Sequence, residues 1–294
     1  MYDVLIIGGG PAGLSAAVYA KRAGLDAVVI EKDYAGGQIA VSEQVDNYLG
    51  LPKTSGYDLS VKFTEHAKML GADFYEGEVL KISKKDNTFV LDFKDESQLL
   101  GKTVIYTAGT SYRRLEVNGS KLNGVSYCAV CDGMFYKDKT VAVVGGGDTA
   151  LGDALYLSRI AKKVYVIHRR DEFRANKSLQ HNVKSADNIE ILYNSQVTEI
   201  FGETRVESIA VSDKKIDVDG VFVAIGSVPN SQLLQGICDL DENGYVIAGE
   251  DGITSTAGIF VAGDVRTKSL RQVITAASDG AFAVMSAENY IENQ

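Results

Sequence analysis

Two cysteines and an aspartate stand together near the middle of the sequence, in the segment SYCAVCDGMFY at residues 126–136. The spacing of Cys128 and Cys131 occurs in metal sites, in disulfides and in redox-active dithiols. A zinc site needs a second pair of ligands, but the remaining cysteine is Cys238 and the three histidines are far apart, so no metal site is expected. A structural disulfide between residues three apart would close a very small loop and stabilise little. A redox pair is therefore favoured, in which two thiols pass on two electrons by disulfide exchange.

A duplicated pattern contains the elements that could position such chemistry. Residues 2–32 and 139–169 superimpose after a constant shift: each has a Val/Ile-rich run, three glycines, a helical pattern of small residues and a second Val/Ile-rich run. This change from a strand pattern to helical spacing and back predicts a βαβ unit in both places. Glycines at the strand–helix turn are typical of loops that receive a dinucleotide pyrophosphate at a helix N-terminus. The candidate loop residues are Gly8, Gly10 and Gly13 in the first copy and Gly145, Gly147 and Ala150 in the second.

The two copies differ where the second strand ends. The first copy ends in Glu31, an acceptor for ribose hydroxyls, which predicts an adenosine without a 2′-phosphate, as in FAD or NAD. The corresponding residue of the second copy is His168, and Arg169, Arg170 and Arg174 follow it. Because guanidinium groups bind a phosphate bidentately, the second site is expected to prefer NADPH.

Composition limits the class of protein. A chain of 294 residues, 45% hydrophobic and 23% charged, is typical of a globular protein with two domains. The net charge of −9 argues against nucleic acid and anionic membranes as partners. Met1 leads almost at once into the apolar run Val4–Ile7, so no secretory signal is expected, and no apolar run reaches the ~20 residues of a membrane span. Three cysteines in so long a chain favour the reducing cytoplasm, with Cys238 as a core residue.

Over nearly its whole length the sequence resembles the low-molecular-weight thioredoxin reductases, which are FAD-dependent pyridine nucleotide-disulfide oxidoreductases. Besides the glycine patterns and CAVCDG, the similar segments are YTAGT (106–110), VAGDVR (261–266) and LRQVITAASDGAFAV (270–284). The resemblance implies an α/β fold with two Rossmann-like, three-layer dinucleotide-binding domains, the second inserted into the first. The expected parts are residues 1–112 and 241–294 for the FAD-binding domain and 113–240 for the NADPH-binding domain.

The same resemblance implies further site residues. Those expected to contact FAD, besides the first loop and Glu31, are Gly37, Gln38, Asn47, Asp264, Arg271 and Gln272. It also implies that the Cys128–Cys131 pair is a catalytic disulfide, with Cys131 nearer the flavin and Cys128 attacking the partner's disulfide. Asp132 is then placed to move the proton that thiol–thiolate interconversion requires.

The implied function is that of a homodimeric thioredoxin-disulfide reductase, which passes two electrons from NADPH through FAD and the redox disulfide to thioredoxin. Two departures concern the nicotinamide end: Gly152 stands where the family has a glutamate, and GSVPN (226–230) lacks the histidine often found before its Pro-Asn. Reduced ferredoxin therefore stays open as an alternative donor, and a redox-sensing flavoprotein without turnover is a second alternative. A ferredoxin–NADP reductase or an NADPH oxidase is disfavoured, because those relatives lack the Cys-x-x-Cys motif.

Overall fold

The computed structural model describes residues 1–42, 44–212 and 214–294. These residues form mixed α/β structure with two larger sheets, of seven and five strands, and two smaller ones. Among the residues described, none of the helices has the length and apolar character of a transmembrane span.

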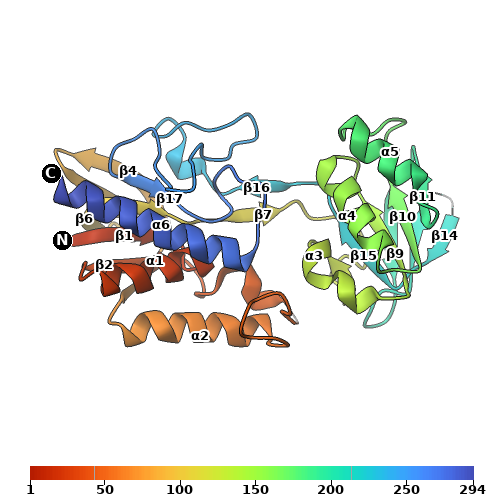
Figure 1. Ribbon diagram of the computed structural model, residues 1–294, viewed down its shortest axis with the longest axis horizontal. Coiled ribbons are helices and arrows are strands. Elements are labelled where there is room, and N and C mark those ends of the chain that lie inside the picture. The colour runs from red at the N-terminus through yellow and green to blue at the C-terminus, as the bar shows by residue number, and fades with distance from the viewer. Residues whose placement is uncertain (43, 213) are drawn as a thin grey trace. The chain divides into compact units, whose positions relative to one another are not determined.

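The chain divides into two compact units (Figure 1). The first unit consists of Met1–Ser111 and Val228–Gln294, and the second is Tyr112–Ser227. Strands β7 (Thr110–Tyr112) and β16 (Ser227–Pro229) pair where the chain leaves the first unit and where it returns.

The first unit contains the seven-stranded sheet, in the order β3-β2-β1-β6-β5-β4, with β17 pairing to β6. Its strands are β1 (Tyr2–Ile7), β2 (Ala27–Glu31), β3 (Asp73–Glu76), β4 (Val79–Lys85), β5 (Thr88–Phe93), β6 (Gln98–Tyr106) and β17 (Ile259–Val261). Its helices are α1 (Pro11–Arg22), α2 (Gly56–Met69) and α6 (Val273–Glu292), with 3-10 turns η1 (Gly37–Val41) and η3 (Gln232–Leu234). Strands β1, β2, β3, β6 and β17 pair in parallel, whereas β4, β5 and β6 pair antiparallel.

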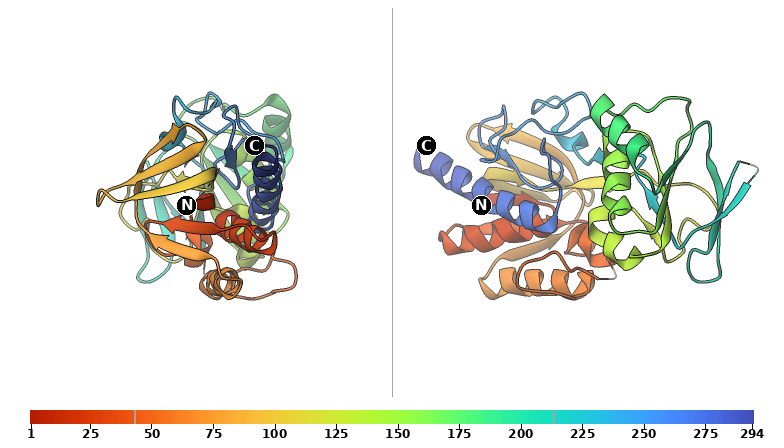
Figure 2. Two further views of the ribbon diagram at one scale, coloured as in Figure 1. Left: turned by 90° about the vertical axis from the view of Figure 1, so that its left-hand side faces the viewer. Right: turned by 45° about the vertical axis from the view of Figure 1, so that its right-hand side comes forward.

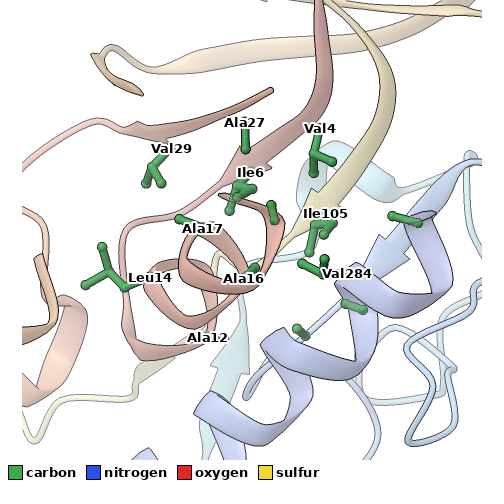
Figure 3. Packing of buried hydrophobic residues seen from close by; sticks show 14 of the residues in the cluster. Val4, Ile6, Ala12, Leu14, Ala16, Ala17, Ala27, Val29, Ile105 and Val284 are labelled. Carbon is green, nitrogen blue, oxygen red and sulfur yellow. The ribbon is translucent and has the colours of Figure 1, made fainter. Parts of the chain in front are cut away.

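Both faces of this sheet are buried, which explains why β1 is a continuous apolar run rather than an alternating one. Val4 and Ile6 face α1 and α6, which lie side by side (Figure 2). Figure 3 shows this layer, in which small residues of α1 such as Ala16 let the helix approach the sheet closely. Leu5 and Ile7 point to the other face, into a cluster with side chains of β4, β5 and η3. The sheet therefore holds the turn between β1 and α1 rigidly.

The second unit repeats this plan with a parallel sheet in the order β11-β10-β9-β15-β8. These strands are β8 (Val125–Ser126), β9 (Thr140–Val144), β10 (Lys163–Ile167), β11 (Ile189–Leu192) and β15 (Gly220–Val223). Helices α3 (Ala129–Asp132), α4 (Asp148–Ser158) and α5 (Lys177–Ser185) and the 3-10 turn η2 (Gly133–Tyr136) complete its helical part. One sheet face packs with α4, and the other with the antiparallel strands β12 (Val197–Phe201), β13 (Ser208–Val211) and β14 (Lys214–Asp217). The α/β fold class predicted from the sequence is thus confirmed.

The return from the second unit to the first differs from the expected boundary after residue 240. The structure places it between Ser227 and Val228, because the following segment packs into the first unit. Leu234 and Cys238 are buried in the cluster that lies on the sheet face opposite α1 and α6. The side chain of Asn230 donates a hydrogen bond to the Ala108 carbonyl at 2.8 Å. The outgoing boundary, after residue 111, lies one residue from the expected position.

Candidate functional site

The cysteine pair forms a disulfide at the start of the short helix α3. Cys128 is the N-cap residue and Cys131 lies within the helix, with their Cα atoms 5.3 Å apart. The backbone N–H of Cys131 donates to the Cys128 sulfur at 3.2 Å, so the single helical turn itself presents one sulfur to the other. Both residues are partly exposed. The pair can therefore open and close without unfolding a larger element.

Asp132 is linked to Cys128 through a residue that the sequence analysis missed. Ser126, a buried residue of β8, donates its hydroxyl to Asp132 Oδ2 at 2.6 Å. The same hydroxyl oxygen accepts the backbone N–H of Cys128 at 3.1 Å. No motif marks Ser126; the signal in the sequence was only its place two residues before the first cysteine.

The first glycine-rich loop is built by β1 and α1. Gly8 has φ +111°, and a Cβ there would lie 2.6 Å from the Thr107 carbonyl oxygen, so this position requires glycine. Gly10 is the N-cap of α1. Gly13 lies in the same helix, at the point where the helix passes close to the loop. Free N–H groups at this helix start suit an anion such as a pyrophosphate.

Glu31 lies at the end of β2, beside this loop. Its Oε2 accepts the Gly9 N–H at 2.7 Å, and its Oε1 accepts the N–H groups of Lys32 and Asp33 at 2.9 and 3.2 Å. A carboxylate has about four acceptor positions, so Glu31 retains capacity for ribose hydroxyls.

The other residues expected at this site belong to the same unit and make close contacts or hydrogen bonds with distant segments of it. Gly37 lies against Gly10: a Cβ at Gly37 would be 3.0 Å from the Gly10 Cα atom. Gln38 donates its side-chain N–H to the Thr110 carbonyl. Asn47 donates to the side chain of Gln272 at 2.9 Å across 225 residues of sequence. The structure thus brings these distant motifs together.

Asp264 carries the clearest sign of a ligand-binding position in the first unit. Its Oδ1 atom is buried and, among the described residues, has no hydrogen-bond partner. Burial raises the pKa of Asp264, and the charges of Lys268 and Arg271 offset this effect only in part. A buried acceptor without a donor is costly, whereas a ligand hydroxyl would satisfy it. The residues present therefore fit the ribitol chain of a flavin.

A buried ionic cluster holds the segment around Asp264, and the sequence analysis did not find it. Asp279 of α6 accepts from Arg266 at 2.7 and 2.9 Å and from Lys268 at 2.8 Å. The same carboxylate accepts the backbone N–H of Gly263 at 2.9 Å. Arg271 adds hydrogen bonds to the carbonyls of Asp264 and Arg266, at 3.3 and 3.4 Å. Charged groups are rarely buried unless paired, and here the pairing orders the loop that carries Asp264.

The second glycine-rich loop lies between β9 and α4. Gly145 has φ +154°, and a Cβ there would lie 2.3 Å from the Ala224 carbonyl oxygen. Gly147 is the N-cap of α4, where a Cβ would meet no atom of the described residues within 4 Å, and Ala150 is fully buried beneath the loop. The same holds for a Cβ at Gly152, five residues after Gly147. Its neighbour Asp153 has a pKa raised to about 7 by burial.

The basic segment that follows β10 divides into two parts. His168 is only 5% exposed, its Nε2 lies 2.9 Å from the Glu172 carbonyl oxygen, and its ring packs under Gly146. Arg169 and Arg170 are exposed, as is Arg174, whose backbone N–H donates to the Gly146 carbonyl at 2.9 Å. His168 thus supports the loop from below, while the arginine segment is tied directly to the loop that would receive a nucleotide.

Comparisons with known proteins agree with this architecture. Residues 2–280 match the family model described as pyridine nucleotide-disulphide oxidoreductase. The chain is 40% identical to the thioredoxin reductase of Bacillus subtilis, over 99% of this chain and 95% of the relative. Its fold matches the crystal structure of thioredoxin reductase from Streptococcus pyogenes with a TM-score of 0.95 and 38% identity, covering 100% and 99% of the two chains. It matches thioredoxin reductase from Giardia duodenalis with a TM-score of 0.93 and 33% identity, covering 99% of both.

Proposed function

Because this chain belongs to the pyridine nucleotide-disulphide oxidoreductases, and among them to the low-molecular-weight thioredoxin reductases, we propose that it passes two electrons from NADPH through FAD to thioredoxin. The chain is an oxidoreductase. The redox-active group formed by its own side chains is the Cys128–Cys131 disulfide. That disulfide carries the proposal, because it closes within one partly exposed helical turn and has a carboxylate as its neighbour.

FAD is the cofactor proposed for the first unit. Glycines 8, 10, 13 and 37 would hold its pyrophosphate, and Glu31 would hold the adenosine ribose. The partnerless Oδ1 of Asp264 supports a ribitol contact there, with Arg271 and the Asn47–Gln272 pair as further contacts. Bound FAD supplies a carrier that accepts a hydride and donates an electron pair to a disulfide.

NADPH is the donor proposed for the second unit. The N-terminus of α4 offers its N–H groups to the pyrophosphate, and Gly147 leaves space for it. Arg169, Arg170 and Arg174 are proposed to bind the 2′-phosphate, because they are exposed and Arg174 is tied to the loop. His168 is proposed to position the loop rather than touch the nucleotide. The comparisons give no support to reduced ferredoxin as the donor.

The two cysteines and Asp132 perform the disulfide exchange. In the reduced protein, the Cys128 thiolate attacks one sulfur of the partner's disulfide, forms a mixed disulfide and releases the first partner thiolate. The Cys131 thiolate then attacks the Cys128 sulfur, which restores the internal disulfide and releases the second thiolate. Two protons leave the cysteines and two reach the partner, and Asp132 is proposed to hold one of them in passage.

A thioredoxin-type protein as the partner is supported by apolar side chains around the disulfide. Val130, Met134 and Phe135 lie within seven residues of Cys128 and are 43, 59 and 38% exposed. Large exposed apolar side chains grouped in this way are typical of protein-binding surfaces. The partner's own cysteine would have to approach Cys128 across this surface.

A homodimer and a cytoplasmic location complete the proposal. Three apolar side chains of α6 are exposed: Ile274, Phe282 and Met285, at 45, 44 and 55%. Their spacing places all three within an arc of about 80° around the helix axis, on one face of the helix. An apolar helix face of this kind suits a second copy of the chain. Light scattering of the purified protein tests the dimer, and a monomer mass at micromolar concentration would contradict it.

Variants of the cysteines test the function most directly. Cys128→Ser and Cys131→Ser should each abolish NADPH-dependent thioredoxin reduction and leave FAD binding intact, since neither touches a glycine loop. Cys238→Ser is the matched control, because Cys238 is buried in the first unit, and it should retain activity. Near-normal activity of either redox-cysteine variant would contradict the assignment.

A separate anaerobic titration tests the electron donor. If NADPH does not bleach the flavin of the wild-type protein but reduced ferredoxin does, ferredoxin is the favoured donor. Absence of turnover with both donors would favour a redox sensor.

A further inference from the structure

We propose that Ser126 is a positioning residue for the dithiol: its hydroxyl holds the Asp132 carboxylate and the Cys128 backbone in one fixed arrangement. The Ser126 hydroxyl donates to Asp132 Oδ2 at 2.6 Å and accepts the Cys128 N–H at 3.1 Å. One side chain thus contacts both the proton-handling group and the residue proposed to attack the partner. This inference rests on the proposed function, in which Asp132 moves a proton during exchange.

The surroundings of Ser126 explain how a single hydroxyl can have this effect. Ser126 is 6% exposed and belongs to β8, which pairs with β15 in the parallel sheet of the second unit. Asp132, in contrast, ends a helix of four residues that has little rigidity of its own. The hydrogen bond from β8 therefore anchors this short turn to the sheet. It is also charge-assisted when Asp132 is ionised, and such bonds are short and strong.

The hydroxyl also favours one charge state of the carboxylate. A donor to a carboxylate stabilises its ionised form, so removing the donor makes the carboxylate bind a proton at higher pH. Without the Ser126 donor, Asp132 is held less well in its charged form and in its position beside the cysteines, so exchange that uses Asp132 should be slower. Titratable groups on the elements that pack against the turn include Asp153 and Tyr156 of α4, which packs on α3, and Tyr136 of η2. None of the variants used below alters these groups, so a change in rate is assigned to Ser126 and Asp132.

The experiment measures disulfide exchange without NADPH or thioredoxin. The full-length protein is reduced with dithiothreitol, desalted and mixed with the aromatic disulfide 5,5′-dithiobis(2-nitrobenzoate), and the coloured thiolate is followed in one turnover across pH. The Cys128 thiolate attacks the reagent and releases one nitrothiolate, and Cys131 then closes the internal disulfide and releases the second. Two thiols are oxidised to one disulfide while one reagent disulfide is reduced to two thiolates, and two protons go to solvent.

Ser126→Ala should slow this exchange about tenfold at neutral pH, since one lost hydrogen bond to a charged group costs on the order of 1.5 kcal/mol. Ser126→Thr, which keeps a hydroxyl and suits a strand, should restore the wild-type rate. Ser158→Ala is the matched control, because its hydroxyl contacts a backbone carbonyl of α4 in the same unit, and its rate should not change. In an Asp132→Asn background, Ser126→Ala should cause no further slowing, since Ser126 acts through Asp132.

Two results would overturn the inference. One is a Ser126→Ala variant whose exchange rate equals that of the wild type across pH. The other is a Ser126→Thr variant that has a wild-type melting temperature but exchanges as slowly as Ser126→Ala, because loss of the hydroxyl would then not be the cause of the slowing. Failure of the proposed function gives a different pattern: NADPH and thioredoxin would not react with the wild type, while the exchange profiles with the small disulfide would still depend on Ser126.

Discussion

The Oε2 atom of Glu31 lies 2.7 Å from the backbone nitrogen of Gly9, so the end of β2 is hydrogen-bonded to the first glycine-rich loop. In the second unit the corresponding residue is His168, whose ring packs under Gly146 of the second glycine-rich loop. Both strand ends therefore support the middle glycine of their loop. Only the first presents a carboxylate there, and the second presents exposed arginines beyond the histidine. This difference, more than the glycines, separates the two candidate nucleotide sites.

Replacing Glu31 with alanine should weaken FAD binding roughly tenfold or more. The change removes a charge-assisted hydrogen bond to Gly9 and the acceptor proposed for the ribose, and such bonds contribute about 1.5–3 kcal/mol. Quenching of flavin fluorescence on titration of the flavin-free protein measures the dissociation constant. Glu76→Ala is the matched control, because Glu76 pairs in register with Glu31 on β3 and is exposed. Equal affinities for both variants would show that Glu31 does not contact the cofactor.

Sequence patterns located the two loops because a βαβ unit is a local feature. Gly9 and Glu31 are 22 residues apart, and the loop glycines follow one strand and precede one helix. The cluster around Asp279 could not be found in this way. The chain has 39 acidic residues, and only the folded packing of α6 on the sheet selects Asp279 as the partner of Arg266 and Lys268.

The same limit applies to the redox turn and to the boundary between the units. The motif around Cys128 placed the disulfide, but the role of Ser126 depends on the backbone of β8 turning its hydroxyl toward Asp132. The return at Val228 depends on Leu234 and Cys238 fitting into the first core, which no pattern of spacing encodes. The resemblance to known reductases suggested a boundary near residue 240. That position lies within the segment that packs into the first unit.

Alanine at both Arg169 and Arg170 should raise the KM for NADPH roughly ten- to hundredfold and leave the KM for NADH nearly unchanged. Loss of one charge-assisted hydrogen bond to the 2′-phosphate costs on the order of 1.5–3 kcal/mol, so the ten- to hundredfold effect is the minimum expected when both arginines are replaced. Steady-state rates with the two nucleotides measure the preference. Arg159→Ala is the control, because Arg159 is an exposed arginine at the far end of α4. If the double variant discriminates between the nucleotides as the wild type does, the two arginines are only a solvated surface.

Asp279→Asn should destabilise the flavin-free protein by about 3 kcal/mol at pH 7, because it leaves Arg266 and Lys268 buried without their counter-ion. Burial alone would raise the pKa of Asp279, but hydrogen bonds from Arg266 and Lys268 and their charges lower it on balance. A lowered pKa stabilises the fold above the unfolded value of about 4, and this stabilisation is lost as pH falls through the folded value. The gap between variant and wild type should therefore narrow below pH 4.

Urea unfolding at a series of pH values, followed by circular dichroism, checks this prediction. Glu292→Gln is the matched control, because it removes an exposed carboxylate at the end of the same helix and should leave the unfolding free energy unchanged at every pH. The ionic cluster would have no stabilising role if Asp279→Asn unfolded at the wild-type urea concentration at pH 7.

Gly152→Ala should stabilise the second unit by about 0.5–1 kcal/mol, because glycine inside a helix costs conformational entropy that alanine does not. Gly152 lies in the interior of α4, and a Cβ there would meet no atom of the part of the chain that the structure describes within 4 Å, so the added methyl group causes no clash. The unfolding free energy from urea titration measures the gain. Gly145→Ala is the opposite control: with φ +154° and a Cβ 2.3 Å from the Ala224 carbonyl oxygen, it should destabilise. A loss of stability in Gly152→Ala would contradict the prediction. A gain in stability together with weaker NADPH binding would identify the nucleotide as the group that occupies the space beside Gly152.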